Sequence, residues 1–244
     1  MKISVVTVTY NNGNGLRKTL QSLSSIKNKP YEIIIIDAES KDNTKSVVDE
    51  YFSKMNIIYI NEKDNGIYDA MNKGHKIANG DYIHYLNAGD CVSGDVYANV
   101  TGTCLIKVGL FNERDSFLGF SNLTHSNTGY CHQGVIFPKE HLDYDLKYKL
   151  CADYDLLQKT FPEGLASLPL ITDGYIKYDM SGVSANKTLL RDKELFAIMW
   201  KNNKRIIPKF VIYVLFKTMI PKGCRRFLRK LKYSISVFSL NGNK

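Results

Sequence analysis

The first 90 residues alternate between apolar runs and segments of helical spacing, and this alternation constrains the fold more than any other feature. Four runs are nearly continuous in apolar character, which predicts strands covered on both faces. They span residues 3–9, 31–37, 56–60 and 82–86. The segments between them predict helices at residues 16–23, from 40–44 to about 52, and at 66–78. We therefore expect a doubly wound α/β fold, Rossmann-like, with a mostly parallel central sheet flanked by helices.

The helix predicted at residues 66–78 carries apolar or small residues at intervals of three and four. This spacing predicts an inner face made of Ile67, Ala70, Met71, Gly74, Ile77 and Ala78.

Polar residues follow three of the predicted strands, at Thr9-Tyr10-Asn11, Asp37-Ala38-Glu39 and Asn87-Ala88-Gly89-Asp90. In doubly wound sheets ligands bind at the carboxyl ends of the strands, so these positions predict a binding site. Neither a GxGxxG after the first strand nor a GxxxxGK[ST] is present. Their absence argues against a dinucleotide-dependent oxidoreductase and a P-loop nucleotidase.

The pattern weakens after residue 90, and residues 91–128 predict no element clearly. Further on, the sequence predicts a strand at 131–137, a helix at 153–160, a strand at 171–178, a loop at 181–184 and a helix at 187–202.

The positive charge is confined to the C-terminal tail. The net charge is +9, but residues 195–244 hold twelve Lys or Arg and no acidic residue, which leaves 21 basic and 24 acidic residues before them. The overall charge is therefore no indication of nucleic-acid binding. The apolar run at residues 210–216 is too short to cross a bilayer. A basic amphipathic helical tail fits better, either on an anionic membrane surface or packed against protein.

The five scattered cysteines show no metal or disulfide spacing, and the N-terminus shows no signal-peptide pattern. Both observations favour a cytoplasmic protein.

Seven segments together resemble the family 2 glycosyltransferases of the GT-A fold, in the form found in bacterial colanic-acid, capsule and O-antigen enzymes. They read VVTVTYN at 5–11, IDAESKDNT at 36–44, DNGIYDAMNKG at 64–74, ANGDYI at 78–83, LNAGD at 86–90, HQ at 132–133 and ADYDL at 152–156. The resemblance implies a GT-A domain over residues 1–194. Residues 1–90 would bind the nucleotide-sugar, residues 91–194 would form the acceptor and catalytic half, and residues 195–244 would form the tail.

The resemblance assigns a divalent cation, Mn²⁺ or Mg²⁺, to Asp90. Relatives usually carry further acidic residues where this chain has Asn87 and Gly89. One carboxylate with two phosphate oxygens and waters is a plausible site for such a cation. The alternative is that residues 87–90 form only a tight turn.

The resemblance assigns the nucleotide to residues at strand ends and on the following helix. These are Thr7, Tyr10, Asp37, Glu39, Asp69, Asn72 and Lys73. The alternatives are structural: Asp37 in a turn or cap, Thr7 in the core, and the three helix residues on a solvated face.

Asp153 matches the family's catalytic base, which takes the proton of the acceptor hydroxyl. Asp155 lies roughly opposite on a helix, where it would cap or face solvent. The alternative is that Asp153 only caps a helix that begins at Tyr154. His132 and Gln133 are assigned to the acceptor or diphosphate side.

We therefore expect an inverting, metal-dependent glycosyltransferase that moves a sugar, from a UDP-sugar, to a lipid-linked glycan in surface polysaccharide synthesis. We expect it to work at the inner face of the cytoplasmic membrane without nucleic acid. The alternatives are a catalytically inactive nucleotide-sugar-binding module and a GT-A-like nucleotidyltransferase.

Overall fold

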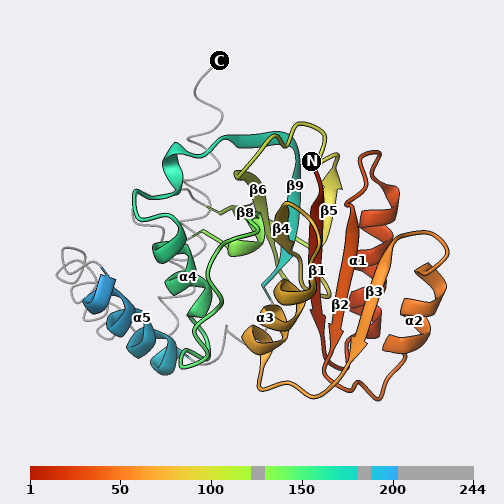
Figure 1. The fold of residues 1–244 in the computed structure, drawn as a ribbon, viewed down its shortest axis with the longest axis horizontal. Helices are drawn as coiled ribbons and strands as arrows, with labels where there is room; N and C mark the ends of the chain where they lie inside the picture. Colours follow the sequence, from red (N-terminus) through yellow and green to blue (C-terminus); the bar gives the residue numbers. More distant parts are fainter. Residues whose placement is uncertain (122–129, 181–187, 203–244) are drawn as a thin grey trace.

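The computed structural model describes residues 1–121, 130–180 and 188–202. These residues form a central sheet flanked by helices (Figure 1). The loop predicted at residues 181–184 and the tail beyond residue 202 lie outside the described residues.

The first half of the chain follows the predicted alternation. Its elements are β1 (Ile3–Thr9), α1 (Gly13–Ser25), β2 (Glu32–Asp37), α2 (Thr44–Tyr51), β3 (Ile57–Asn61), α3 (Ile67–Ile77) and β4 (Tyr82–Tyr85).

The second half adds short strands, two 3-10 helices and two α-helices. Its elements are β5 (Cys91–Gly94), β6 (Cys104–Phe111), β7 (Phe117–Phe120), η1 (His132–Gly134), β8 (Val135–Pro138), α4 (Ala152–Thr160), η2 (Leu165–Ser167), β9 (Leu170–Asp179) and α5 (Thr188–Asn202).

The sheet runs in the order β3-β2-β1-β4-β8-β6-β9-β5, with β7 paired to β6. Strands β3, β2, β1 and β4 are parallel, as predicted, but β8 joins β4 in antiparallel orientation, and the rest of the sheet is mixed. The order reverses at β1, which lies between β2 and β4. Because parallel crossovers are right-handed, α1 and α2 cover one face of the sheet and α3 covers the other.

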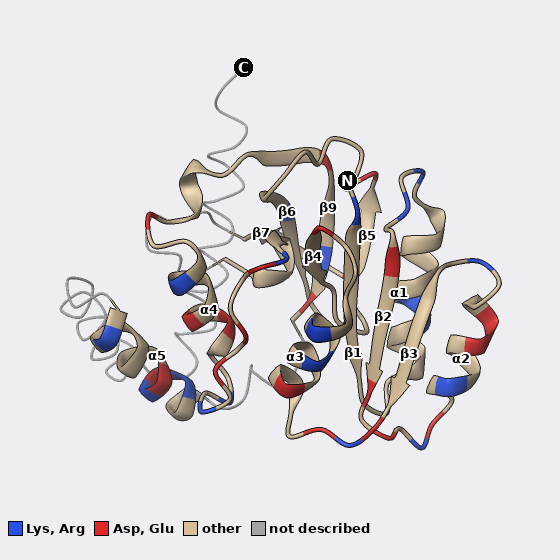
Figure 2. Ribbon diagram, viewed as in Figure 1, with Lys and Arg blue, Asp and Glu red and all other residues tan. Residues whose placement is uncertain are grey.

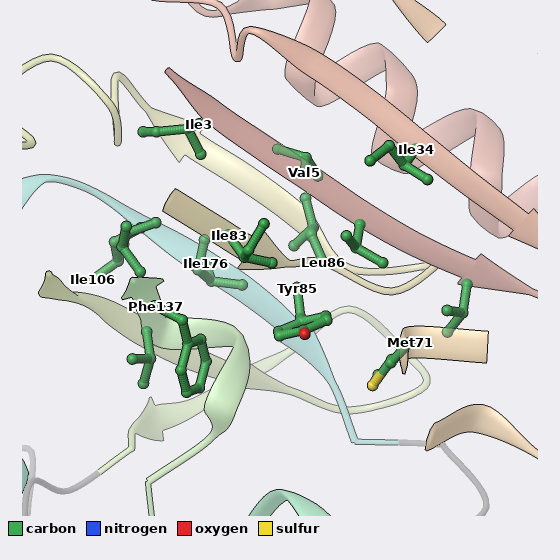
Figure 3. Close-up of a cluster of buried hydrophobic side chains, with 14 of the residues drawn as sticks. Ile3, Val5, Ile34, Met71, Ile83, Tyr85, Leu86, Ile106, Phe137 and Ile176 are labelled. Carbon is green, nitrogen blue, oxygen red and sulfur yellow. The ribbon is translucent and has the colours of Figure 1, made fainter. Parts of the chain in front are cut away.

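The core extends across the whole sheet. All seven residues of β1 are buried, and buried side chains from β4, β6, β8 and β9 continue the same cluster (Figure 3). Leu16, Leu20 and Leu23 of α1 are fully buried, as the helical spacing predicts. On the other face, a Cβ added to Gly74 would lie 2.4 Å from Val6 Cγ1. Glycine at this position therefore lets α3 lie close to β1.

β9 pairs with two strands of the second half and ends beside the last residue of the first half. It pairs parallel with β6 and antiparallel with β5, the strand that directly follows Asp90. As a result the end of β9, at Asp179, lies beside Asp90.

Three predictions of local structure were wrong: the inner face of α3, the start of the strand at 131–137, and the place of Asp155. The α3 face excludes Ile67 and Ile77, which are 45% and 38% exposed, and includes Asn72 and His75, because both side chains hydrogen-bond to the segment at residues 139–144. The strand predicted at 131–137 begins with a 3-10 turn.

Asp155 neither caps nor faces solvent. It is 1% exposed and forms an ion pair with Lys159. The helix that carries Asp155 begins at Ala152. The alternative that Asp153 only caps a helix beginning at Tyr154 required a start two residues later.

Within the described ranges, no helix combines the length and apolar character needed to cross a bilayer.

Candidate functional site

The loops that follow β1 and β2 are joined by hydrogen bonds. The Asn11 N–H donates to Ser40 Oγ at 2.8 Å, and Lys41 N–H donates to Asn11 Oδ1 at 2.7 Å. Asp42 accepts from Gly13 N–H at 2.8 Å, at the start of α1, and also caps α2 through Thr44. Charged residues gather in the loops after β2 and β3 (Figure 2). The loops after β1 and β2 thus form one surface at the carboxyl edge of the sheet.

Asp37 lies under this surface with its carboxylate already partnered. It is 1% exposed, and it accepts from Ser40 N–H at 3.0 Å and from the Tyr59 hydroxyl at 2.6 Å. The neighbouring Glu39 is exposed and has φ of +56°, a left-handed conformation that is uncommon for a glutamate. Of the two acidic residues predicted for the nucleoside, Glu39 is therefore the more accessible.

Thr7 of β1 and Tyr10, which follows β1, are also predicted nucleotide residues, and they differ in exposure. Thr7 is fully buried, and its Oγ1 has no hydrogen-bond partner among the described residues. Tyr10 is 65% exposed at the loop that follows. Only Tyr10 has a surface that a ligand reaches directly.

The three predicted residues of α3 contact protein groups. Asp69 accepts from Asn65 N–H at 2.9 Å, and Lys73 Nζ lies 2.9 Å from Glu62 Oε1. Asn72 donates to Tyr144 O at 2.9 Å and accepts from Tyr144 N–H at 2.8 Å. Asp69 and Lys73 thus lie by the turn that enters α3, whereas Asn72 holds the backbone of another segment. Their contact with a nucleotide stays a prediction.

Asp90 ends the turn after β4 and is 5% exposed. Burial raises the pKa of its carboxyl to about 7, although hydrogen bonds from Asp179 N–H and the Gln133 side chain act in the opposite direction. The Asp179 N–H lies 2.7 Å from Asp90 Oδ1. A desolvated carboxylate without a full counter-charge is a group that a cation would stabilise.

The oxygen atoms around this turn fit a hard divalent cation. The Asn87 Oδ1 is buried without a hydrogen-bond partner among the described residues, and the Asp179 carboxylate is close enough to act on the pKa of Asp90. Carboxylate and amide oxygens are ligands of Mg²⁺ and Mn²⁺. No cluster of three or more His, Cys, Asp or Glu side chains suited to a metal exists in the described ranges. Phosphate oxygens and water would have to complete the coordination.

The 3-10 turn η1 connects Asp90 with Asp153. Gln133 Oε1 accepts from Asn87 N–H at 3.1 Å on one side of the turn. On the other side, His132 Nδ1 lies 3.4 Å from Asp153 Oδ2. Between them, burial raises the pKa of the Cys131 thiol, and the charges of both Asp90 and Asp153 raise it further. The two predicted carboxylates therefore lie on either side of one short segment.

Asp153 is held by three groups and is 31% exposed. Its Oδ1 accepts from the Tyr68 hydroxyl at 3.1 Å and from Tyr154 N–H at 2.9 Å, and its Oδ2 faces His132. Burial alone would raise the pKa of Asp153, but these hydrogen bonds and the histidine outweigh it and lower the pKa. The carboxylate is thus ionised at neutral pH and is open to a substrate.

An aromatic wall, made of Tyr68, Tyr85, His132 and Tyr144, borders Asp153. Tyr68 stacks on Tyr144 at 5.2 Å between ring centroids, and His132 meets the edges of Tyr85 and Tyr144. The Tyr144 hydroxyl and His132 Nε2 are buried and have no hydrogen-bond partner among the described residues. The described residues therefore leave the hydrogen-bonding capacity of two buried polar atoms of the wall unused.

A cavity of about 460 Å³ lies beside Gly89 and Cys91, the two neighbours of Asp90 in the chain. Its walls include Lys18 and Ser22 of α1, Phe111 at the end of β6, and Lys177 and Asp179 of β9. The segment after β6 also lines it, within the region where the sequence predicted no clear element. The turn that carries Asp90 therefore borders an open space lined by charged and aromatic side chains.

The sequence prediction missed Tyr68 and Asp179 as site residues. Tyr68 belongs to the DNGIYDAMNKG motif, so its place there was a usable signal. Asp179 had no local signal, because its contact with Asp90 joins residues 89 positions apart.

Comparisons with known proteins find similarity in sequence and in fold. The sequence model described as Glycosyl transferase family 2 matches residues 4–101. Among curated proteins, the poly(ribitol-phosphate) beta-N-acetylglucosaminyltransferase TarP of Staphylococcus aureus is 31% identical over 93 residues, which are 36% of this chain and 28% of TarP.

Two solved structures show the same fold. S. aureus TarS in complex with UDP aligns with a TM-score of 0.64 at 18% identity, over 82% of this chain and 63% of that one. The mannosyltransferase PcManGT of Pyrobaculum calidifontis, in complex with GDP-Man and Mn²⁺, aligns with a TM-score of 0.59 at 13% identity, over 86% and 68%. The chain thus spans less than a third of TarP and under two thirds of the TarS structure. Residues 4–101 are thus similar in sequence to glycosyl transferase family 2, and the solved structures share the fold of this chain.

Proposed function

We propose that this chain is an inverting, metal-dependent glycosyltransferase that transfers a sugar from a nucleotide-sugar, a UDP-sugar in the first instance, to a lipid-linked glycan in surface polysaccharide synthesis. The observation that carries the proposal is the placement of Asp90 and Asp153 on either side of η1. Gln133 contacts the turn of Asp90, and the adjacent His132 contacts Asp153.

Asp153 acts as the general base. An inverting transfer requires a carboxylate that accepts the proton of the acceptor hydroxyl while its oxygen attacks the anomeric carbon. The low pKa of Asp153 keeps it ionised, and its contacts with Tyr68 and His132 fix its direction. The partial exposure of Asp153 leaves room for the acceptor hydroxyl to approach.

Asp90, with Asn87 beside it, would hold the divalent cation against the donor diphosphate. When bound, the cation would neutralise charge on the departing nucleoside diphosphate. Tyr10 and Glu39, exposed on the loops after β1 and β2, would contact the nucleoside. The UDP in the TarS structure supports a uridine donor, and the GDP-Man in PcManGT keeps a guanosine donor as an alternative.

The cavity beside Asp90 supports an extended acceptor. Phe111 offers a ring on which a sugar face can stack, and Asp179 and Lys177 offer hydrogen-bonding groups for hydroxyls. The basic tail would hold the enzyme on the anionic inner face of the cytoplasmic membrane, where a lipid-linked acceptor is anchored.

A donor screen tests the proposal. The protein is incubated with a panel of UDP- and GDP-sugars with Mn²⁺ or Mg²⁺, and release of nucleoside diphosphate is measured. We expect turnover with at least one donor, its loss in Asp90→Ala, and retained donor binding without transfer in Asp153→Asn. A matched control is Glu163→Gln, which removes an exposed carboxylate on the turn after α4.

Two results would contradict the proposal. Donor binding without turnover for any sugar would favour the inactive binding module. Turnover that Asp90→Ala leaves unchanged would remove the metal role of this residue.

The membrane part has its own test. Deletion of residues 206–244 should release the protein from vesicles that contain anionic phospholipid, measured by co-sedimentation. Binding that the deletion leaves intact would instead favour a tail packed on protein.

A further inference from the structure

We infer that Glu194 of α5 is a positioning residue for Asp153, because it fixes the segment from which the helix of Asp153 begins. This inference rests on the proposed function, since it gives Asp153 the role of base.

The contact consists of three consecutive backbone amides on one carboxylate. Lys149 N–H donates to Glu194 Oε1 at 2.8 Å, while Leu150 N–H and Cys151 N–H donate to Oε2 at 2.9 and 3.0 Å. Glu194 is 8% exposed. Hydrogen bonds to an ionised acceptor are stronger than neutral ones, and burial protects them from competition with water.

These amides lead directly into α4. Cys151 is the N-cap residue of α4, and its own side chain makes no capping hydrogen bond. The first amides of a helix have no partner within the helix and need one from elsewhere. Glu194 supplies a partner to the amide of the N-cap residue Cys151 and fixes the two residues before it, and its negative charge is favourable at the positive end of α4.

Asp153 follows Cys151 by two residues, so the direction of its carboxylate depends on the first turn of α4. Its contacts with Tyr68 and His132, at 3.1 and 3.4 Å, tolerate little displacement. A misplacement of about 1 Å in a reacting group costs about 100-fold in rate.

Helix α5 is well placed to hold Glu194. Ile198 and Met199 are buried, and Asn202 Nδ2 donates to Asp155 Oδ1 of α4 at 3.3 Å. Cys151 Sγ also lies 3.7 Å from Arg191 O. The helix spans the domain boundary predicted at residues 194 and 195. Through Glu194, the element that precedes the basic tail is thus connected to the base.

The test uses the full chain with Glu194→Gln, Glu194→Asp and the control Glu163→Gln. Glutamine keeps the size but removes the charge and one acceptor atom, whereas aspartate keeps the charge on a shorter side chain. Hydrogen exchange of amides 149–151 reports the contact directly. The pKa of Asp153, measured by ¹³C-carboxyl NMR titration, reports its position without any need for turnover. Steady-state kinetics with the active donor and Mn²⁺ reports the effect on catalysis.

In Glu194→Gln we expect faster exchange at amides 149–151, a higher pKa for Asp153 and a fall in kcat of about 10- to 100-fold. KM for the donor should stay within about twofold of wild type, because the nucleotide loops are untouched. The exchange rates, the Asp153 pKa and the kcat of Glu194→Asp should lie between those of wild type and Glu194→Gln. Those of Glu163→Gln should match wild type. If Glu194→Gln does not fold, the same measurements on Glu194→Asp decide.

Unchanged exchange at 149–151 would overturn the contact, and faster exchange with an unchanged Asp153 pKa and kcat would overturn the positioning role. A wild-type protein inactive with every donor would contradict the proposed function instead. In that case the shift in the pKa of Asp153 would still decide whether Glu194 positions it.

Discussion

Asn72 gives the sharpest test of which predicted site residues are structural. Its side-chain amide pairs with both backbone groups of Tyr144, at 2.9 and 2.8 Å, and both hydrogen bonds are buried. Asn72→Ala leaves the Tyr144 N–H and C=O without partners. A buried polar group left unsatisfied costs about 1–3 kcal/mol, so the two together predict a loss of about 4 kcal/mol in the free energy of unfolding.

For a chain of this size a loss of 1 kcal/mol lowers Tm by about 2–4 °C, so the expected fall is about 10 °C. Urea unfolding followed by far-UV circular dichroism measures the free energy, and calorimetric titration measures UDP affinity in Mn²⁺. Asn61→Ala is the matched control, because Asn61 is exposed at the end of β3. A loss under about 1 kcal/mol in the free energy of unfolding, together with a tenfold weaker UDP affinity, would refute this reasoning. It would indicate that the Asn72 amide binds the nucleotide.

Three further predictions follow from individual contacts. Tyr68→Phe removes one hydrogen bond that lowers the pKa of Asp153. Because the base acts when ionised, the acid limb of the kcat/KM profile should move to higher pH by about one unit. An acid limb that does not move would contradict this contact. Gly74→Val places a Cβ 2.4 Å from Val6 Cγ1 and should cost about 1–3 kcal/mol in urea unfolding through overpacking; an unchanged midpoint would mean that α3 shifts freely. Glu32→Ala leaves the buried Ser4 hydroxyl and Asn79 N–H without their acceptor, at 2.6 Å each, and should lower stability by about 2–4 kcal/mol; a thermal melt that matches wild type would count against these bonds.

The sequence predicted the elements of the first 90 residues well because their signals are local. Strands such as β1 and β2 are buried on both faces, so their apolar runs are continuous, and the carboxylates that follow them lie at one edge of the sheet by topology. The fold places the turn of Asp90 and the side chain of Asp153 against adjacent residues of η1, and their roles stay predictions.

What the sequence did not predict depends on contacts between distant residues. For strand β6 the sequence predicted no clear element, and its place between β8 and β9 is known only from the fold. The α3 face was misjudged because apolar Ile67 is exposed, while polar Asn72 and His75 are buried with partners about 64–72 residues away. The contact of Glu194 has no local signal either, because the three amides that meet its carboxylate lie 43–45 residues earlier in the chain.

The contact of Asp90 with Asp179 also has a consequence for how the protein folds during synthesis. Strands β1 to β4 and their helices are contiguous in the chain, so they can form early, whereas β5 waits for β9 to pair with it. Contacts between residues so far apart form late, because a long loop has to close first. The ribosome must therefore release residue 179 before Asp90, 89 positions earlier, acquires its backbone partner. A nascent chain that ends before this point would contain the Asp90 carboxylate but not the Asp179 N–H that hydrogen-bonds to it.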